Sequence, residues 1–101
     1  MANPIEKINK TFESRIRLGI MSILMVNESV DFNSLKEILE ITDGNLASHI
    51  KALEFEEMII VSKRFVGRKP NTSYACSDKG KRAFIDHINA LEILIRSQEL
   101  K

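Results

Sequence analysis

The chain has 101 residues, a length that suits a single domain. Hydrophobic residues make up 44% of it and charged residues 29%, which excludes an intrinsically disordered chain. The net charge of +1, taken alone, argues against a protein that binds nucleic acid. The single cysteine, Cys76, cannot form an internal disulfide, and a lone free thiol is typical of the reducing cytoplasm. The longest apolar stretch, residues 18–26, is too short to span a bilayer.

The N-terminal segment has the pattern of an amphipathic helix. Pro4 suits a first helical turn, and apolar residues then recur at three- and four-residue spacing as far as Leu24. This pattern predicts one long helix that ends near residue 27, or two helices with a bend at residues 9–11. A short extended segment at residues 30–32 separates it from the next helix.

Two short helices joined by a tight turn come next. The second helix begins at Ser34, and Asp31, Asn33 or Ser34 can cap it. It stops before a glycine-containing turn, and Thr42 is the expected N-cap of the third helix. Helices joined by so few residues fit helix-turn-helix geometry, which we place at residues 34–55. The core face of the third helix carries Leu46, Ile50 and Leu53.

The hydrophobic period then changes from that of a helix to that of strands. Residues 58–66 are rich in β-branched side chains and predict a strand. Residues 67–71 contain glycine and proline and predict a turn, and residues 72–76 predict a second strand. The two strands form a hairpin with a basic tip, which we place at residues 58–77 and call the predicted wing.

A final helix completes the chain. Ser77 or Asp78 caps it, and it runs to about Gln98. The element order is therefore helix, short strand, helix, helix, strand, strand, helix. This order predicts a mainly α domain with a small β-hairpin, a winged helix-turn-helix that occupies residues 1–101 as one unit.

The distribution of charge reverses the conclusion drawn from the total. Residues 28–57 carry a net charge of −6, whereas residues 58–82 hold seven basic residues and one acidic residue, a net charge of +6. A cationic hairpin beside a helix-turn-helix is the electrostatic pattern of a surface that contacts the phosphate backbone. The alternative is a solvated hairpin whose charges serve solubility, and the helix order favours DNA contact.

Three segments resemble small winged-helix transcriptional regulators of the MarR and ArsR groups. The run KRFVGRKPNTSY (63–74) looks like their wing, and TDGNLASHIKALE (42–54) is similar to their recognition helix. The run SDKGKRAF (77–84) matches the end of their wing. The resemblance spans roughly residues 12–96. It implies a DNA-binding homodimer that regulates transcription, with double-stranded DNA as its partner.

The outer face of the third helix supplies the candidate base-reading residues. Asn45 and Ser48 can donate and accept hydrogen bonds at base edges in the major groove, and Gly44 allows close approach to the duplex. Lys51 and Thr42 are better placed for phosphates. His49 lies off the core direction, where it is either a structural histidine or a DNA contact.

In the predicted wing, the tip residues Arg68 and Lys69 are the strongest candidates for contacts to the backbone and minor groove. Lys63 and Arg64 alternate across a strand, so at most one of them faces DNA. The candidate DNA-binding residues are Thr42, Gly44, Asn45, Ser48, His49, Lys51, Lys63, Arg64, Arg68, Lys69 and Asn71.

Three other side chains of the predicted wing are expected to pack rather than to contact DNA. Phe65 and Tyr74 are interpreted as core or wing packing instead of base-stacking residues. Cys76 is expected to be a small buried apolar group, because nothing near it in sequence indicates a reactive thiol.

Both ends of the chain carry more apolar surface than one core requires. This excess predicts that residues 1–27 and 78–101 also pack across the two-fold axis of a homodimer. A monomer with thick terminal helices is the alternative. The candidate interface residues are Ile5, Ile8, Phe12, Ile88, Leu91 and Ile95.

No motif predicts catalysis or a cofactor. The sequence lacks a glycine-rich phosphate loop and a nucleophile elbow, so no catalytic residue is assigned. His49 and His87 belong to no ligand cluster, and no metal is predicted. No residue indicates whether a small-molecule effector binds. The rival function is a winged-helix protein-interaction module that uses the acidic surface of residues 28–57 to bind a basic partner.

Overall fold

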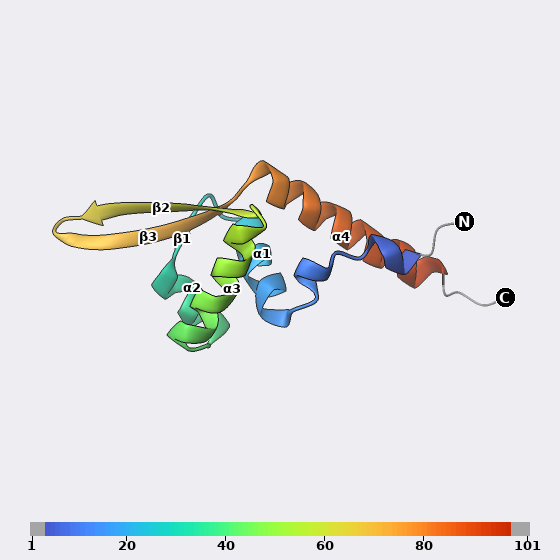
Figure 1. The fold of residues 1–101 in the computed structure, drawn as a ribbon, viewed down its shortest axis with the longest axis horizontal. Helices are drawn as coiled ribbons and strands as arrows, with labels where there is room; N and C mark the ends of the chain where they lie inside the picture. The colour runs from blue at the N-terminus through green and yellow to red at the C-terminus, as the bar shows by residue number, and fades with distance from the viewer. Residues whose placement is uncertain (1–3, 98–101) are drawn as a thin grey trace.

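The computed structural model describes residues 4–97 of the chain. The hairpin projects from one end of a helical body and the last helix projects from the other (Figure 1), so the molecule measures 63 × 26 × 21 Å. The elements in chain order are η1 (Pro4–Lys7), η2 (Lys10–Phe12), α1 (Arg15–Met25), β1 (Val30–Asp31), α2 (Phe32–Leu39), α3 (Asp43–Phe55), β2 (Ile59–Val66), β3 (Lys69–Cys76) and α4 (Asp78–Ser97). A winged helix-turn-helix, mainly α with a small β-hairpin, is therefore confirmed.

The N-terminal segment differs from the single long helix that its apolar spacing permits. It is broken into two 3₁₀ turns and α1, because polar side chains cap new turns at two points. The Asn9 side chain accepts a hydrogen bond from the Thr11 N–H at 2.9 Å, and the Ser14 hydroxyl accepts one from the Arg17 N–H at 3.3 Å. The expected bend is present, but the residues before it form 3₁₀ turns rather than an α-helix.

Side-chain caps define the starts of the next helices. The Asp31 carboxylate accepts from the Ser34 N–H at 2.7 Å, so α2 begins at Phe32, two residues before the predicted start. The Thr42 hydroxyl accepts from the Asn45 N–H at 3.2 Å, which confirms Thr42 as the N-cap of α3.

The sheet has the strand order β1-β3-β2, and both pairings are antiparallel. The turn between β2 and β3 contains only Gly67 and Arg68, and Gly67 adopts a φ of +67° that suits glycine. The prediction of a five-residue turn is wrong, because Lys69 and Pro70 already pair with β2 as part of β3. Proline is tolerated there because β1 pairs only with the inner part of β3, which leaves the outer part without a second neighbour.

The core lies between the helices and the inner end of the sheet. Phe12 is 0% exposed, and its ring meets those of Phe84 and His87 edge-on at centroid distances of 5.5 and 5.3 Å. Its assignment to a dimer interface is therefore wrong, because the ring fills the space between η2 and α4 within one chain. The other core residues are Ile20, Met21, Leu24, Leu35, Leu46, Ile50, Leu53, Met58, Ile59, Tyr74, Cys76 and Phe84.

Candidate nucleic-acid interface

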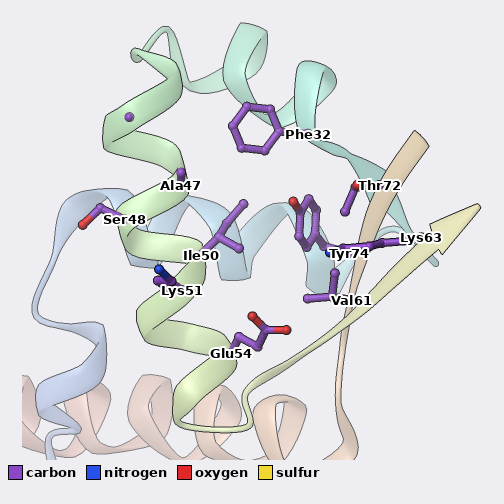
Figure 2. Close-up of a pocket in the computed structure, with 11 residues that line it drawn as sticks. Phe32, Ala47, Ser48, Ile50, Lys51, Glu54, Val61, Lys63, Thr72 and Tyr74 are labelled. Atoms are coloured by element: carbon purple, nitrogen blue, oxygen red, sulfur yellow. The ribbon is translucent and has the colours of Figure 1, made fainter. Parts of the chain in front are cut away.

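A groove of about 570 Å³ separates α3 from the sheet (Figure 2). We call it the α3–wing groove, and the wing is residues 59–76. The α3 side bears small and polar side chains, and the strand side bears residues of β2 and β3. The groove is lined by Phe32, Gly44, Ala47, Ser48, Ile50, Lys51, Glu54, Val61, Lys63, Thr72 and Tyr74.

The helical face predicted to point inward does so. Leu46, Ile50 and Leu53 are buried, which leaves Ser48 and Lys51 exposed beside the groove. In Figure 2, Ala47 and Ile50 point toward the sheet, whereas Ser48 points away from it. Two of the predicted residues, Asn45 and Thr42, are exposed but do not line the groove.

The start of α3 is open enough for another molecule to approach closely. A Cβ atom at Gly44 would meet nothing within 4 Å in the chain. The adjacent acidic group, Asp43, forms an ion pair with Lys36 of α2 at 2.8 Å, which offsets its negative charge at this surface. Close approach of a polyanion is therefore neither blocked sterically nor opposed by an unpaired carboxylate at this point.

The His49 side chain forms a hydrogen bond within the protein. The Arg17 guanidinium Nε–H of α1 donates to His49 Nδ1 at 3.2 Å, and another of its nitrogens lies 3.5 Å from the Thr11 carbonyl oxygen. Burial lowers the pKa of His49, and the positive charge of Arg17 lowers it further. The histidine is half-buried and ties α3 to α1. Sequence reasoning did not find Arg17, because only tertiary packing brings it to His49.

Strand alternation assigns the charged wing residues to different faces. Lys63 lines the groove with Val61, so Arg64 lies on the opposite face. Across the ladder, Lys63 pairs with Thr72. Only Lys63 of this pair lies on the face turned toward α3, and the prediction that at most one of the two faces DNA stays a prediction.

The two aromatic residues of the wing behave differently. Tyr74 is only 7% exposed and belongs to the core, as expected. Phe65 is 73% exposed, so its interpretation as a packing residue is wrong. It lies too close to the hairpin tip for any helix of the described chain to cover it. Cys76 is buried as predicted, and burial raises the pKa of its thiol.

The tip of the wing is strongly cationic. Arg68 lies in the turn and Lys69 begins β3, and both are exposed. Asn71 pairs with Arg64 on the face opposite Lys63 and is half-buried beside Asp31. Hydrogen bonds from the Ser34 backbone and side chain, and a weaker one from Asn71, lower the pKa of Asp31. Asn71 therefore links β3 to Asp31, which ends β1 and caps α2.

The candidate interface residues at the chain ends are partly exposed. Ile5, Ile88 and Ile95 are exposed, and Ile8 and Leu91 are half-buried. Ile85 and Ile93 of α4, which belong to the same excess of apolar residues in the sequence, are exposed as well. An apolar hollow of about 290 Å³ lies between α1 and α4 and is lined by Ser22, Met25, Val26, Phe84, Ile85, Ile88 and Asn89.

The described part of the chain also bears on metal sites and membrane spans. In this part of the chain, no three His, Cys, Asp or Glu side chains are grouped so that they could hold a metal ion. Among the described helices, none combines the length and apolar character needed to cross a membrane.

Other proteins are similar to this chain in sequence and in architecture. A family model described as "Winged helix DNA-binding domain" matches residues 16–95. An uncharacterized protein of Methanocaldococcus jannaschii is 36% identical over 92 residues, which are 91% of this chain and 98% of that protein.

Solved structures of other proteins have a similar fold. A transcriptional regulator homologue from Pyrococcus horikoshii is 28% identical with a TM-score of 0.77, over 94% of this chain and 99% of that one. The YusO protein of Bacillus subtilis has the same fold at 17% identity, with a TM-score of 0.77 over 94% of this chain and 67% of its own. The order of elements, the α3–wing groove and these likenesses lead to one conclusion: this chain belongs to the family of winged helix DNA-binding domains.

Proposed function

We propose that this protein is a sequence-specific transcriptional regulator of the MarR/ArsR-like type, which binds double-stranded DNA as a homodimer in the cytoplasm. The observation that carries the proposal is the α3–wing groove. On one side of it lies an exposed, uncharged stretch in the first half of α3, with Gly44, Ala47 and Ser48, followed by the charged Lys51 and Glu54. On the other side lies a wing with four exposed cations, Lys63, Arg64, Arg68 and Lys69. This combination suits base reading on one side and phosphate contact on the other.

In this proposal α3 enters the major groove by its N-terminal half. Asn45 and Ser48 read base edges, and the open space around Gly44 lets the helix approach the duplex. Lys51 contacts phosphate, and Thr42 reaches the backbone only through the part of its hydroxyl not engaged in capping. We assign His49 the structural role, because its Nδ1 already accepts from Arg17.

The wing contributes charge. Lys63 faces the DNA strand that occupies the α3–wing groove, and Arg68 and Lys69 reach the adjacent minor groove. Arg64 and Asn71 lie on the other face of the hairpin, so we propose a smaller contribution from Arg64 and none from Asn71.

The homodimer is proposed from the apolar side chains exposed along α4. Ile85, Ile88 and Ile95 lie within about 80° of one another around the helix and form a stripe beside the apolar hollow between α1 and α4. A two-fold pairing through this stripe presents two recognition helices to one DNA face, about 34 Å apart, on an inverted repeat. Sedimentation at several concentrations tests it: a species of one chain's mass at all of them contradicts the dimer.

Selection of bound fragments from random DNA at two salt concentrations tests the function itself. We expect an inverted repeat with half-sites one helical turn apart. On that site, the Arg68→Ala/Lys69→Ala variant should bind more weakly across all sequences, and its salt slope should fall by about one per lost contact. Asn45→Ala should instead relax sequence preference. Lys10→Ala removes an exposed cation of η2, which belongs neither to the wing nor to the α4 stripe, and is the control.

The rival function has one observation in its favour. Phe55, at the end of α3, is 86% exposed and stands among Glu54, Glu56 and Glu57. If the double wing variant binds duplex DNA with unchanged affinity and salt dependence, the DNA-binding surface is wrong. The acidic surface of residues 28–57 then becomes the candidate site for a basic protein partner.

A further inference from the structure

Phe65 is an aromatic side chain that the fold leaves uncovered. It is 73% exposed, whereas Tyr74, which occupies the same face of the hairpin nearer the body, is 7% exposed. Single exposed apolar residues are common on protein surfaces and need no explanation on their own. The position of Phe65 relative to the α3–wing groove and to the charges of the wing gives this one significance.

Strand geometry places Phe65 on the face of the wing that is turned toward α3. Val61 and Lys63 line the α3–wing groove, and alternation along β2 puts Phe65 on the same face, one step closer to the tip. Its cross-strand partner is Pro70. The outer wing therefore carries an apolar pair of a ring and a proline on the groove side.

The charges around Phe65 and Pro70 indicate which kind of molecule binds there. Lys63 is exposed on the same face as Phe65, Arg68 is exposed in the turn, and Lys69 is exposed next to Pro70 on the opposite face. Among residues 4–97 no salt bridge joins any of the three to a carboxylate. Three cations disfavour a second copy of the same wing, because like charges would be brought together. They attract a polyanion, and the minor groove of DNA offers apolar sugar walls and base steps between its phosphates.

We propose that Phe65, backed by Pro70, is an apolar wedge that enters the minor groove and partly unstacks one base step. Phenylalanine and proline are among the residues that open base steps in this way, and the duplex then kinks toward the major groove. The inference rests on the proposed function. It adds a specificity determinant: the step at the wedge should be a flexible pyrimidine–purine step, because such steps unstack most easily.

Affinity and salt dependence separate the wedge from the cations. On the selected duplex, Phe65→Ala should weaken binding about tenfold, the scale of one lost aromatic–base contact. Its salt slope should stay at the wild-type value, because no phosphate contact is lost. Val66→Ala is the matched control: it is the next residue, also apolar and 63% exposed, but on the opposite face of β2. It should bind like the wild type, and equal urea midpoints show that all variants fold.

The shape of the bound DNA is the second readout. Energy transfer between dyes at the two ends of a 30-base-pair duplex should report a kink of roughly 20–90° with the wild type and with Val66→Ala, and a straighter duplex with Phe65→Ala. Replacing the pyrimidine–purine step under the wing by an A-tract should weaken the wild type but not Phe65→Ala.

The outcomes distinguish this inference from the function beneath it. If Phe65→Ala matches Val66→Ala in affinity and bend, the wedge is wrong while DNA binding stands. A loss of affinity with an unchanged bend also overturns the wedge, because the ring then only touches the surface of the duplex. If the wild type shows no preference for any duplex and the Arg68→Ala/Lys69→Ala variant binds no more weakly, the proposed function itself fails.

Discussion

Gly80 provides the sharpest test of how the wing is attached to the body. It lies in the first turn of α4, where a Cβ atom would stand 1.9 Å from the Met58 carbonyl oxygen and 2.8 Å from the carbonyl carbon. Both are backbone atoms of the residue just before β2, so no side chain can move aside to relieve the contact. The same junction holds two hydrogen bonds, from the Ser77 N–H to the Met58 oxygen at 3.1 Å and from the Ser77 hydroxyl to the Glu57 oxygen at 2.6 Å.

Gly80→Ala must therefore move α4 away from β2 by roughly 1 Å. Overpacking of this kind costs about 1–3 kcal/mol, and loss of the two hydrogen bonds adds about 1 kcal/mol each. The higher helix propensity of alanine stabilises α4 by about 1 kcal/mol relative to glycine, which offsets part of this cost. The expected net loss in free energy of unfolding is about 2–4 kcal/mol, a fall of at least about 8 °C in Tm for a domain of this size.

Urea unfolding at a fixed protomer concentration measures this, because the stability of a dimer depends on concentration. Gly44→Ala is the control: the same substitution in the first turn of α3, where nothing lies within 4 Å, should leave stability unchanged or raise it slightly. If Gly80→Ala is as stable as the wild type, the close packing of α4 on the Met58 backbone is wrong.

Three further predictions concern the core, a cap and pH. Phe12→Ala should lower the free energy of unfolding by about 3–5 kcal/mol in urea, because the ring is fully buried against Phe84. Thr42→Ala removes the N-cap of α3 and should cost about 1 kcal/mol by the same measurement, whereas Thr42→Ser should cost less. Burial lowers the pKa of His87, whose Nδ1 accepts from the Asn9 N–H at 3.1 Å, so the unfolded chain takes up a proton first as pH falls. The free energy of unfolding should therefore keep its full value above pH 6.5 and fall below it. His87→Asn keeps an acceptor without titrating, so its free energy of unfolding should depend less steeply on pH. An equally steep dependence for that variant would show that His87 is not the group responsible.

Local signals predicted most of the elements correctly. The faces of α3 follow from apolar spacing alone, and Thr42 was recognisable as a cap because its hydroxyl acts within three residues of the chain. The strands of the wing were recognisable from β-branched residues. The end of β3 was missed, since Pro70 normally marks a turn and is accommodated here only because the outer β3 has one neighbour.

The errors at the candidate site came from long-range contacts. Phe12 and Ile8 belong to one apolar pattern in the sequence, yet only Phe12 is enclosed, because His87 and Phe84 approach it from α4. The spacing of apolar residues along the chain cannot distinguish a side chain that is buried in the core of its own chain from one that is buried only in a dimer interface. Phe65 shows the reverse error: an aromatic residue in a strand usually packs, but the hairpin extends beyond the body.

The net charge of +1 illustrates what each level decides. The amino-acid order is enough to reveal that this value is the sum of a basic segment and an acidic one. It also fixes the order of elements that makes the basic segment a wing, because both depend on neighbours along the chain. Which of those charges face α3 depends on the folded arrangement, since strand register separates Lys63 from Arg64. The same arrangement ties His49 to Arg17 and leaves Phe65 exposed, because both depend on residues brought together or kept apart by packing.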